Sequence, residues 1–142
     1  MIKVQNANAN KIFKWFASST DVFKGQLIKS ASGAAPVAAA HTGTTLLGVA
    51  MEDQTTTNGV VYLYPLTGTI LEIDVLQTGT KKTFAVTDLG SQYDIVVASD
   101  ATASMSLDPD DTTGGFLILV DYDNDNHKAY CVVEAADILL SI

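Results

Sequence analysis

Apolar and polar residues alternate with a period of two along several short segments of this chain, while sustained helical periodicity is almost absent. In Leu71-Glu72-Ile73-Asp74-Val75, the aliphatic side chains point to one face of a strand and the carboxylates to the other. Val60–Tyr64 is rich in β-branched and aromatic residues and stops at Pro65, whereas Phe116–Val120 is continuously apolar, as in a strand buried on both faces. The same reasoning predicts further strands at Lys11–Ala17, Gln26–Lys29, Thr45–Met51, Lys82–Val86, Tyr93–Ala98 and Lys128–Glu134.

Turn-forming residues separate these strands, most clearly at Asn58-Gly59 and at the run Asp123-Asn124-Asp125-Asn126. Short strands with turns every ten or so residues predict an all-β fold, a compact barrel or sandwich of antiparallel strands. The polar residues 1–10 are expected to form a flexible, extended N-terminal arm. Residues 11–142 are expected to form a single β domain, with two β-units that could meet near residues 77–90.

Two other segments have weaker patterns. The Ala-, Thr- and Gly-rich stretch Ala34–Thr45 predicts a loop around a short strand at Pro36–Ala38. The final apolar run, Asp137–Leu140, fits either a short strand or a single helical turn.

The formal charge of −8 is unevenly distributed along the chain. Residues 1–50 carry five Lys and one Asp, a net of +4, and residues 51–142 carry three Lys and fifteen acids, a net of −12. The chain contains no Arg, the residue best suited to bidentate phosphate and guanine contacts. We therefore expect no nucleic-acid partner, because such binding needs a basic face.

Hydrophobic residues make up 47% of the chain and charged residues only 17%. No apolar run approaches the roughly 20 residues that cross a bilayer, so we expect no membrane partner. Asn6, Asn8 and Asn10 interrupt any apolar stretch of the kind that a signal peptide needs. The apolar excess fits subunit interfaces and a well-filled core equally well.

No arrangement of residues predicts catalysis. His127 and Cys131 would lie about 13 Å apart on one strand, too far for a dyad, and the other histidine is His41. Cys131 sits in an apolar run and is expected to be a buried structural thiol. Glu72 and Asp74 could imitate a glycosidase pair, but solvated carboxylates on an outer strand face are the favoured interpretation. We therefore expect a protein that is not an enzyme and uses no cofactor.

The most metal-like segment has acids at Asp121, Asp123 and Asp125, a spacing found in calcium loops. Two requirements of an EF-hand loop fail, because the sixth position is Asn126 and the twelfth is Val132. An Asp/Asn-rich hairpin tip is the favoured interpretation, and calcium remains a weaker hypothesis. The acids of Asp108-Pro109-Asp110-Asp111 have the same two interpretations.

One aromatic cluster, Ile12-Phe13-Lys14-Trp15-Phe16, follows the predicted arm. Strand alternation places Phe13 and Trp15 on one face and Ile12 and Phe16 on the other, so both faces are apolar. The cluster is either an inner strand of the domain or an anchor for a neighbouring subunit. If the arm adds a strand to a partner's sheet, Ile2 and Val4 join Ile12, Phe13, Trp15 and Phe16 as candidate interface residues.

A series of motifs follows in order along the chain: Asp21–Lys29, Gly33, Pro36-Val37, Leu46-Leu47-Gly48-Val49-Ala50, Thr57-Asn58-Gly59 leading into Val60–Pro65, Gly90–Ile95 and Phe116–Asp123. This order, over roughly residues 10–134, resembles that of the head decoration, or cement, proteins of tailed bacteriophages.

The resemblance implies a compact β body, usually a homotrimer, that binds the major capsid protein where capsomers meet. It also implies a location on the outer surface of the virion capsid after assembly in the host cytoplasm, and it implies no catalytic residue. A second hypothesis, drawn from the residues, is a carbohydrate- or surface-binding β-module of a phage tail or fibre. It depends on exposure of Tyr62, Tyr64, Tyr93 and Tyr122 beside acids.

Overall fold

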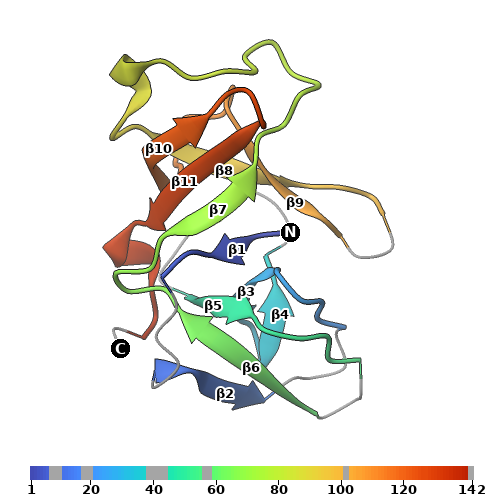
Figure 1. The fold of residues 1–142 in the computed structure, drawn as a ribbon. Helices are drawn as coiled ribbons and strands as arrows, with labels where there is room; N and C mark the ends of the chain where they lie inside the picture. Colours follow the sequence, from blue (N-terminus) through green and yellow to red (C-terminus); the bar gives the residue numbers. More distant parts are fainter. Residues whose placement is uncertain (7–10, 17–20, 38–44, 56–58, 101–102, 141–142) are drawn as a thin grey trace.

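A computed structural model describes residues 1–142 except 7–10, 17–20, 38–44, 56–58, 101–102 and 141–142. The described chain forms two antiparallel sheets, one above the other in Figure 1, which confirms the predicted all-β fold. In strand order, sheet A consists of β1 (Lys3–Val4), β7 (Leu71–Asp74), β11 (Lys128–Val133), β10 (Leu117–Asp123), β8 (Gln92–Val97) and β9 (Met105–Asp108). Sheet B consists of β2 (Phe13–Phe16), β6 (Val60–Pro65), β5 (Leu46–Ala50), β3 (Leu27–Ser30) and β4 (Ala34–Pro36). Two short 3₁₀ turns, η2 (Val86–Asp88) and η3 (Ala135–Asp137), complete the described elements.

Sheet A curls until its two ends meet. Just past the end of β7, Val75 forms a parallel bridge with Leu107 of β9, and the Leu76 N–H donates to the Leu107 carbonyl at 2.9 Å. The first half of β7 pairs instead with β1, through Lys3 opposite Glu72 and Val4 opposite Leu71. Strand β11 pairs with one side of β7, and β1 and β9 share the other side. Sheet A therefore has little open edge, as in a small barrel.

Sheet B is open at both ends of its strand order. Its edge strand β4 is three residues long and ends in Pro36, which has no N–H to offer a further strand. Its other edge strand, β2, contains no proline, and among the described strands it pairs with β6 alone. Among the described residues, sheet B therefore has one edge that can accept a strand, at β2.

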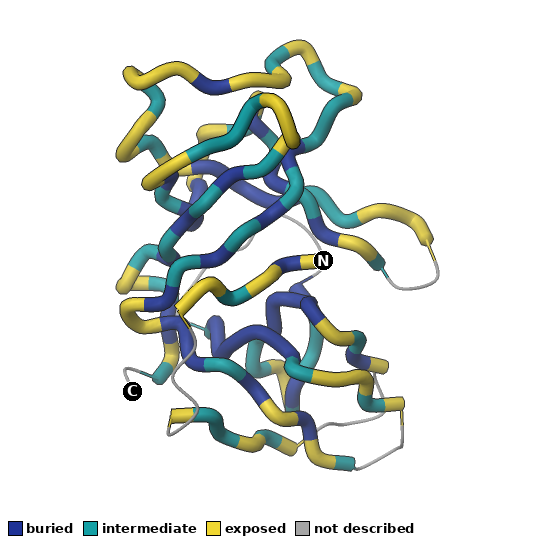
Figure 2. Tube along the Cα trace, viewed as in Figure 1, coloured by how far each residue is buried: buried dark blue, intermediate teal, exposed yellow. Residues whose placement is uncertain are grey.

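The main hydrophobic core lies between the two sheets. It joins sheet B residues such as Leu27, Leu46 and Val49 to sheet A residues such as Phe116 and Leu119. Figure 2 shows this buried band running through the middle of the molecule. A second, smaller core covers the other face of sheet B and contains Val22, Ile28, Ala34, Leu47, Ala50, Val61 and Leu63.

The first six residues lie in the seam between the two sheets, so they do not form the extended arm predicted from their polar composition. Ile2 is only 2% exposed and belongs to the main core. The Ile2 N–H donates to the Gly25 carbonyl at 3.0 Å, and the Gln5 N–H donates to the Ile70 carbonyl at 2.9 Å. Burial of Ile2 and this backbone pairing outweigh the polarity of the neighbouring residues. Residues 7–10 of the predicted arm lie outside the described residues.

Most predicted strands are present, with three differences. Instead of the predicted strand Lys82–Val86, residues 82–85 form a loop and Val86 begins η2. The backbone N–H and C=O of Phe84 both bond the Asn124 side chain rather than another strand. The strand β9 was not predicted. The chain passes from sheet B to sheet A between Pro65 and Leu71, earlier than the 77–90 region suggested by the sequence.

Candidate interaction surface

Strand β2 presents a different kind of surface on each of its two faces. Antiparallel pairing sets Phe13 opposite Leu63 and Trp15 opposite Val61 on the face that carries the smaller core. On the opposite face, Lys14 lies across from Tyr62 and Phe16 across from Val60. We call this second set, Lys14, Phe16, Val60 and Tyr62, the β2–β6 face.

The β2–β6 face is exposed and mostly apolar. Phe16 is 52% exposed, Val60 41% and Tyr62 43%. Cross-strand neighbours in an antiparallel sheet lie about 5 Å apart, so these side chains form one continuous surface. Exposed apolar side chains scattered singly are common, but a contiguous cluster on an edge strand indicates a binding surface.

The β2–β6 face continues the surface that forms the main core. Val49 of β5 belongs to that core, and its cross-strand partner Tyr64 packs against it. Two residues earlier on β6, Tyr62 lies on the same face but is exposed. Sheet A therefore covers this face of sheet B at β3, at β5 and at Tyr64 of β6, but leaves it uncovered at Val60, Tyr62 and β2. Strand β2 lies at the lower end of the molecule in Figure 1.

A shallow groove of about 560 Å³ runs beside β2 and is lined by Ile12, Phe13, Lys14 and Tyr62. Both lysines of this segment, Lys11 and Lys14, are exposed, and no acid occurs between residues 11 and 16. The groove therefore combines aromatic walls with positive charge. That combination suits an apolar partner segment that carries carboxylates.

The predicted interface residues fall into two groups. Ile12, Phe13, Trp15 and Phe16 lie together on or beside β2, with Phe13 and Trp15 half-buried against the smaller core. Ile2 and Val4 lie elsewhere, inside or against the main core. The structure therefore does not support Ile2 and Val4 as exposed partner contacts, because their apolar side chains are used within the chain's own fold.

The acids proposed for calcium are part of the hairpin between β10 and β11. Asp123 accepts bonds from the backbone N–H groups of Asp125 and Asn126, at 3.1 and 3.2 Å, and from the Asn126 side-chain amide at 2.7 Å. The Asn126 hydrogen bonds hold the pKa of Asp123 below its usual value. Within the described ranges no group of three or more His, Cys, Asp or Glu side chains is arranged to hold a metal, and Asp121 and Asp125 do not converge with Asp123. The geometry fits a hairpin tip that is stabilised by its own side chains.

The acids at 108–111 accept backbone hydrogen bonds that stabilise loops at the sheet A end of the molecule. Asp110 accepts from the backbone N–H groups of Thr80 and Lys81, at 2.7 and 3.0 Å. Asp111 accepts from the N–H of Thr113 at 3.2 Å. These carboxylates therefore have structural partners on the backbone.

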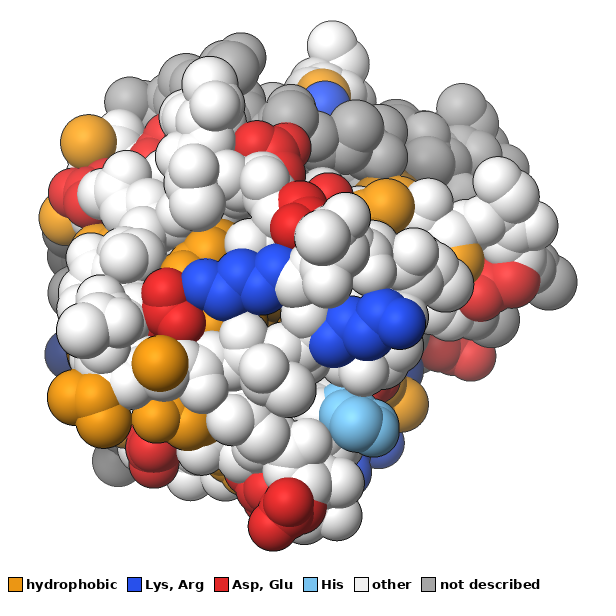
Figure 3. Space-filling view, turned by 90° about the horizontal axis from the view of Figure 1, so that it is seen from above, with side chains coloured by type: hydrophobic (Ala, Val, Ile, Leu, Met, Phe, Trp, Pro, Cys, Tyr) orange, Lys and Arg blue, Asp and Glu red, His pale blue; other side chains and the backbone are white. Residues whose placement is uncertain are grey.

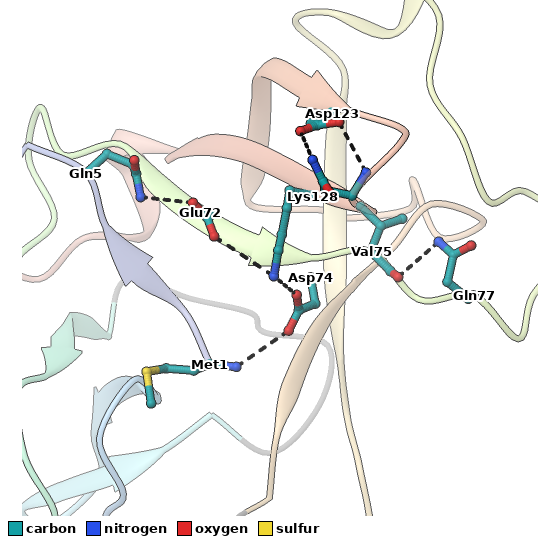
Figure 4. A network of polar contacts seen from close by, with 9 residues as sticks. Met1, Gln5, Glu72, Asp74, Val75, Gln77, Asp123 and Lys128 are labelled. Carbon is teal, nitrogen blue, oxygen red and sulfur yellow. Dashed lines mark hydrogen bonds and ion pairs between the residues drawn. The ribbon is translucent and has the colours of Figure 1, made fainter.

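The residues considered for catalysis that the structure describes do not assemble into a site, and His41 lies outside the described residues. Cys131 is fully buried, as predicted, and burial raises the pKa of its thiol to about 12. Glu72 and Asp74 both contact Lys128, and the N-terminal amino group lies 3.6 Å from Asp74 (Figure 4). Partial burial pushes the pKa of Asp74 upward, but the Lys128 ammonium and the amino terminus together lower it. An ion-paired carboxylate held in this way is a poor general acid.

A polar cluster that the sequence pattern did not reveal closes the long loop between β7 and β8. The Lys81 ammonium donates to Asp88 at 2.7 Å and lies 5.6 Å from the ring centre of Phe84 and 5.9 Å from that of Tyr93. The hydrogen bond to Asp88 raises the pKa of Lys81, and the same bond lowers the pKa of Asp88. Nothing in the local sequence marks these residues, because their contacts depend on how the loop returns to the sheet.

The four tyrosines of the carbohydrate hypothesis do not form one platform. Tyr93 is 1% exposed and belongs to the main core, with Phe84 packed against its ring at 5.4 Å. Tyr122 packs against the same core, at the sheet A end. Of the four, only Tyr62 has an exposed side chain, at 43%.

No protein-family model matches this chain, and a search of curated proteins found no significant match. No helix among the described residues is long and apolar enough to span a bilayer.

Proposed function

We propose that this chain is a structural virion protein that binds the outside of a bacteriophage capsid and joins neighbouring capsid subunits. The observation that carries the proposal is the exposed β2–β6 face beside the β2 edge, which no described strand covers. The acids that could suggest a metal or catalytic site instead include Asp110 and Asp123, which accept backbone hydrogen bonds within the chain's own loops. The order of strand motifs that resembles phage decoration proteins supports the same function. A homotrimer is the expected form on the shell.

A cementing role makes physical demands that this fold can meet. A protein that binds only the expanded shell stabilises that state by mass action, by about 2.7 kcal/mol at a hundredfold excess over Kd. Such binding needs apolar area and complementary shape rather than acid–base groups. Aromatic residues at the centre of an interface supply most of the binding energy in many complexes, and Phe16 and Tyr62 have the exposure that this role requires.

Co-sedimentation with expanded capsid shells tests the proposal. The shells are assembled from the major capsid protein of the phage that encodes this chain. We expect the wild-type protein to sediment with the shells, and we expect Phe16→Ser and Tyr62→Ser each to weaken binding by about tenfold or more.

Leu89→Ser is the matched control, because Leu89 is 43% exposed, like Tyr62, but lies in the long loop at the sheet A end. It is expected to bind as the wild type does. The proposal is wrong if the wild-type protein stays in the supernatant at all concentrations, or if Leu89→Ser lowers binding as much as Phe16→Ser.

A further inference from the structure

We infer that β2 binds its partner by strand addition, and that the added strand alternates apolar with polar residues and carries a carboxylate opposite Lys14. This inference rests on the proposed function and names the kind of capsid segment that this surface accepts. Three features of the described structure lead to it: the free edge of β2, the chemistry of its two faces, and its local charge.

The edge of β2 is the strand edge best suited to accept another strand within the described part of the chain. The free side of β7 is shared by β1 and by Leu107 of β9. The outer side of β1 faces sheet B. There the Ile2 N–H already donates a hydrogen bond to the Gly25 carbonyl. Strand β4 is three residues long and ends in Pro36. The four residues of β2 pair with β6 on one side only.

The backbone of such an edge can form hydrogen bonds to another strand. In an antiparallel pair, alternate residues direct their N–H and C=O groups toward the partner strand, and the residues between them direct theirs away. The outward groups of β2 are therefore a template for another strand, which can pair with them with little demand on sequence. Natural proteins usually blunt such edges with short strands, prolines or charges, as β4 is blunted here.

The side chains of β2 set the pattern of the added strand. On the β2–β6 face, an incoming residue lies opposite Lys14, where a carboxylate is favoured, or opposite Phe16, where an apolar side chain is favoured. On the other face, the half-buried Phe13 and Trp15 offer apolar contacts. A strand with apolar residues at every second position and a carboxylate among the intervening ones satisfies both faces.

The charge on β2 disfavours pairing with a second copy of the same strand. Residues 11–16 contain Lys11 and Lys14 and no acid. Pairing β2 with β2 would bring the lysines of both copies onto one short sheet junction, and like charges across strands are destabilising. The occupant is therefore a strand of different sequence, from a capsid subunit.

The test uses two synthetic strand peptides of equal length, in which Val alternates with Glu in one and with Lys in the other. Each is titrated into ¹⁵N-labelled protein. We expect the Glu peptide to shift the backbone amide resonances of residues 13–16, and to bind at least threefold more tightly than the Lys peptide. Lys14→Glu is expected to reverse this preference.

Lys82→Glu is the control, because Lys82 is an exposed lysine in the loop at the sheet A end, and the same change of charge there should leave the preference unaltered. Strand addition at β2 is overturned if the shifts centre on another element, if neither peptide binds, or if Lys14→Glu does not alter the preference.

Amide hydrogen exchange of the shell-bound protein separates the two proposals. If the protein binds shells but the amides of residues 13–16 exchange as fast as in the free protein, strand addition fails and capsid binding stands. If the Glu peptide binds at β2 but shells do not bind, the function fails and the strand-accepting edge stands.

Discussion

The two sheets are completed in different ways. Sheet A is closed by the bridge between Val75 and Leu107. Its loops are stabilised by side chains such as Asp110 and Asn124, which accept backbone hydrogen bonds. Sheet B ends in β2, whose outer edge pairs with no other described strand and whose outer face carries exposed Phe16. On the function proposed above, the closed sheet maintains the fold and the open sheet would supply the binding surface.

Charge follows the same division. Residues 66–142 contain thirteen acids and three lysines, a net of −10, whereas residues 11–65 contain three acids and four lysines, a net of +1. Figure 3 looks down on the sheet A end and shows acidic side chains dispersed around lysines there. Several of these acids accept backbone N–H bonds, including Asp88, Asp108, Asp110, Asp111 and Asp123. Part of the negative charge at the sheet A end thus stabilises loops.

The largest expected effect comes from breaking the closure of sheet A. Leu107 is fully buried at the bridge to Val75, so Leu107→Ala should lower the free energy of unfolding by about 2–5 kcal/mol. Val60→Ala also truncates an aliphatic side chain, but on the exposed β2–β6 face. It should change the free energy of unfolding by about 0.5 kcal/mol or less. Urea denaturation measures both. Equal losses would show that the open face contributes to the fold as much as the closure does.

An intermediate effect is expected at the seam between the sheets. Gly25 has a positive φ of 81°, and a Cβ there would meet the Met1 side chain and the Ile2 carbonyl. Gly68 also has a positive φ, of 68°, but has open space around it. Gly68→Ala should therefore cost about 1 kcal/mol from backbone strain alone, and Gly25→Ala about 2 kcal/mol, because the N-terminal segment must also move.

Thermal or urea unfolding of these two glycine variants measures the difference. The larger cost at Gly25 reports the docking of residues 1–6 between the sheets. Identical costs at the two positions would mean that this segment contributes nothing to joining sheet A to sheet B.

The smallest effect is expected at the Lys81–Asp88 pair, which closes the loop over sheet A. Both side chains are partly exposed, so Lys81→Met should lower stability at neutral pH by at most about 1 kcal/mol. The pKa of Asp88 is lowered, so its contribution is present above the unfolded pKa near 3.8 and is lost as pH falls through the folded value. The pKa of Lys81 is raised, so its contribution is lost only as pH rises above 10.5.

Unfolding midpoints measured from pH 2 to pH 7 check this prediction. The wild type should lose more stability than Lys81→Met below about pH 4, because the variant has already lost the ion pair. Parallel curves for the two proteins would show that the Lys81–Asp88 pair does not contribute to stability.

Much of the fold could be predicted from the sequence because strand alternation is a local signal. The segments around β2, β3, β5, β6, β7, β8, β10 and β11 all show β-branched residues or period-two patterning. The failures are non-local. Phe84 lies in a loop because Asn124, forty residues away, bonds its backbone. Residues 1–6 have a polar composition but dock through Ile2 and backbone pairing.

The candidate site was only half predictable. The apolar cluster around Phe13 and Trp15 is visible in the sequence, and alternation correctly separates these residues from Phe16. Whether β2 is an inner or an edge strand depends on the strand order of the whole sheet, which no local pattern contains. Val60 and Tyr62 join the surface only through their register with β2.

Amide hydrogen exchange tests most directly whether β2 is an open edge that binds a partner while sheet A maintains the fold. The comparison is between β2 and β11, in the free and in the shell-bound protein. In the free protein, residues 13–16 should exchange far faster than residues 128–133, which lie between β7 and β10. Binding to shells should slow exchange in residues 13–16 and leave β11 unchanged. If β2 is already as protected as β11 in the free protein, or if shell binding leaves β2 unchanged, the central claim of an open, partner-binding edge is wrong.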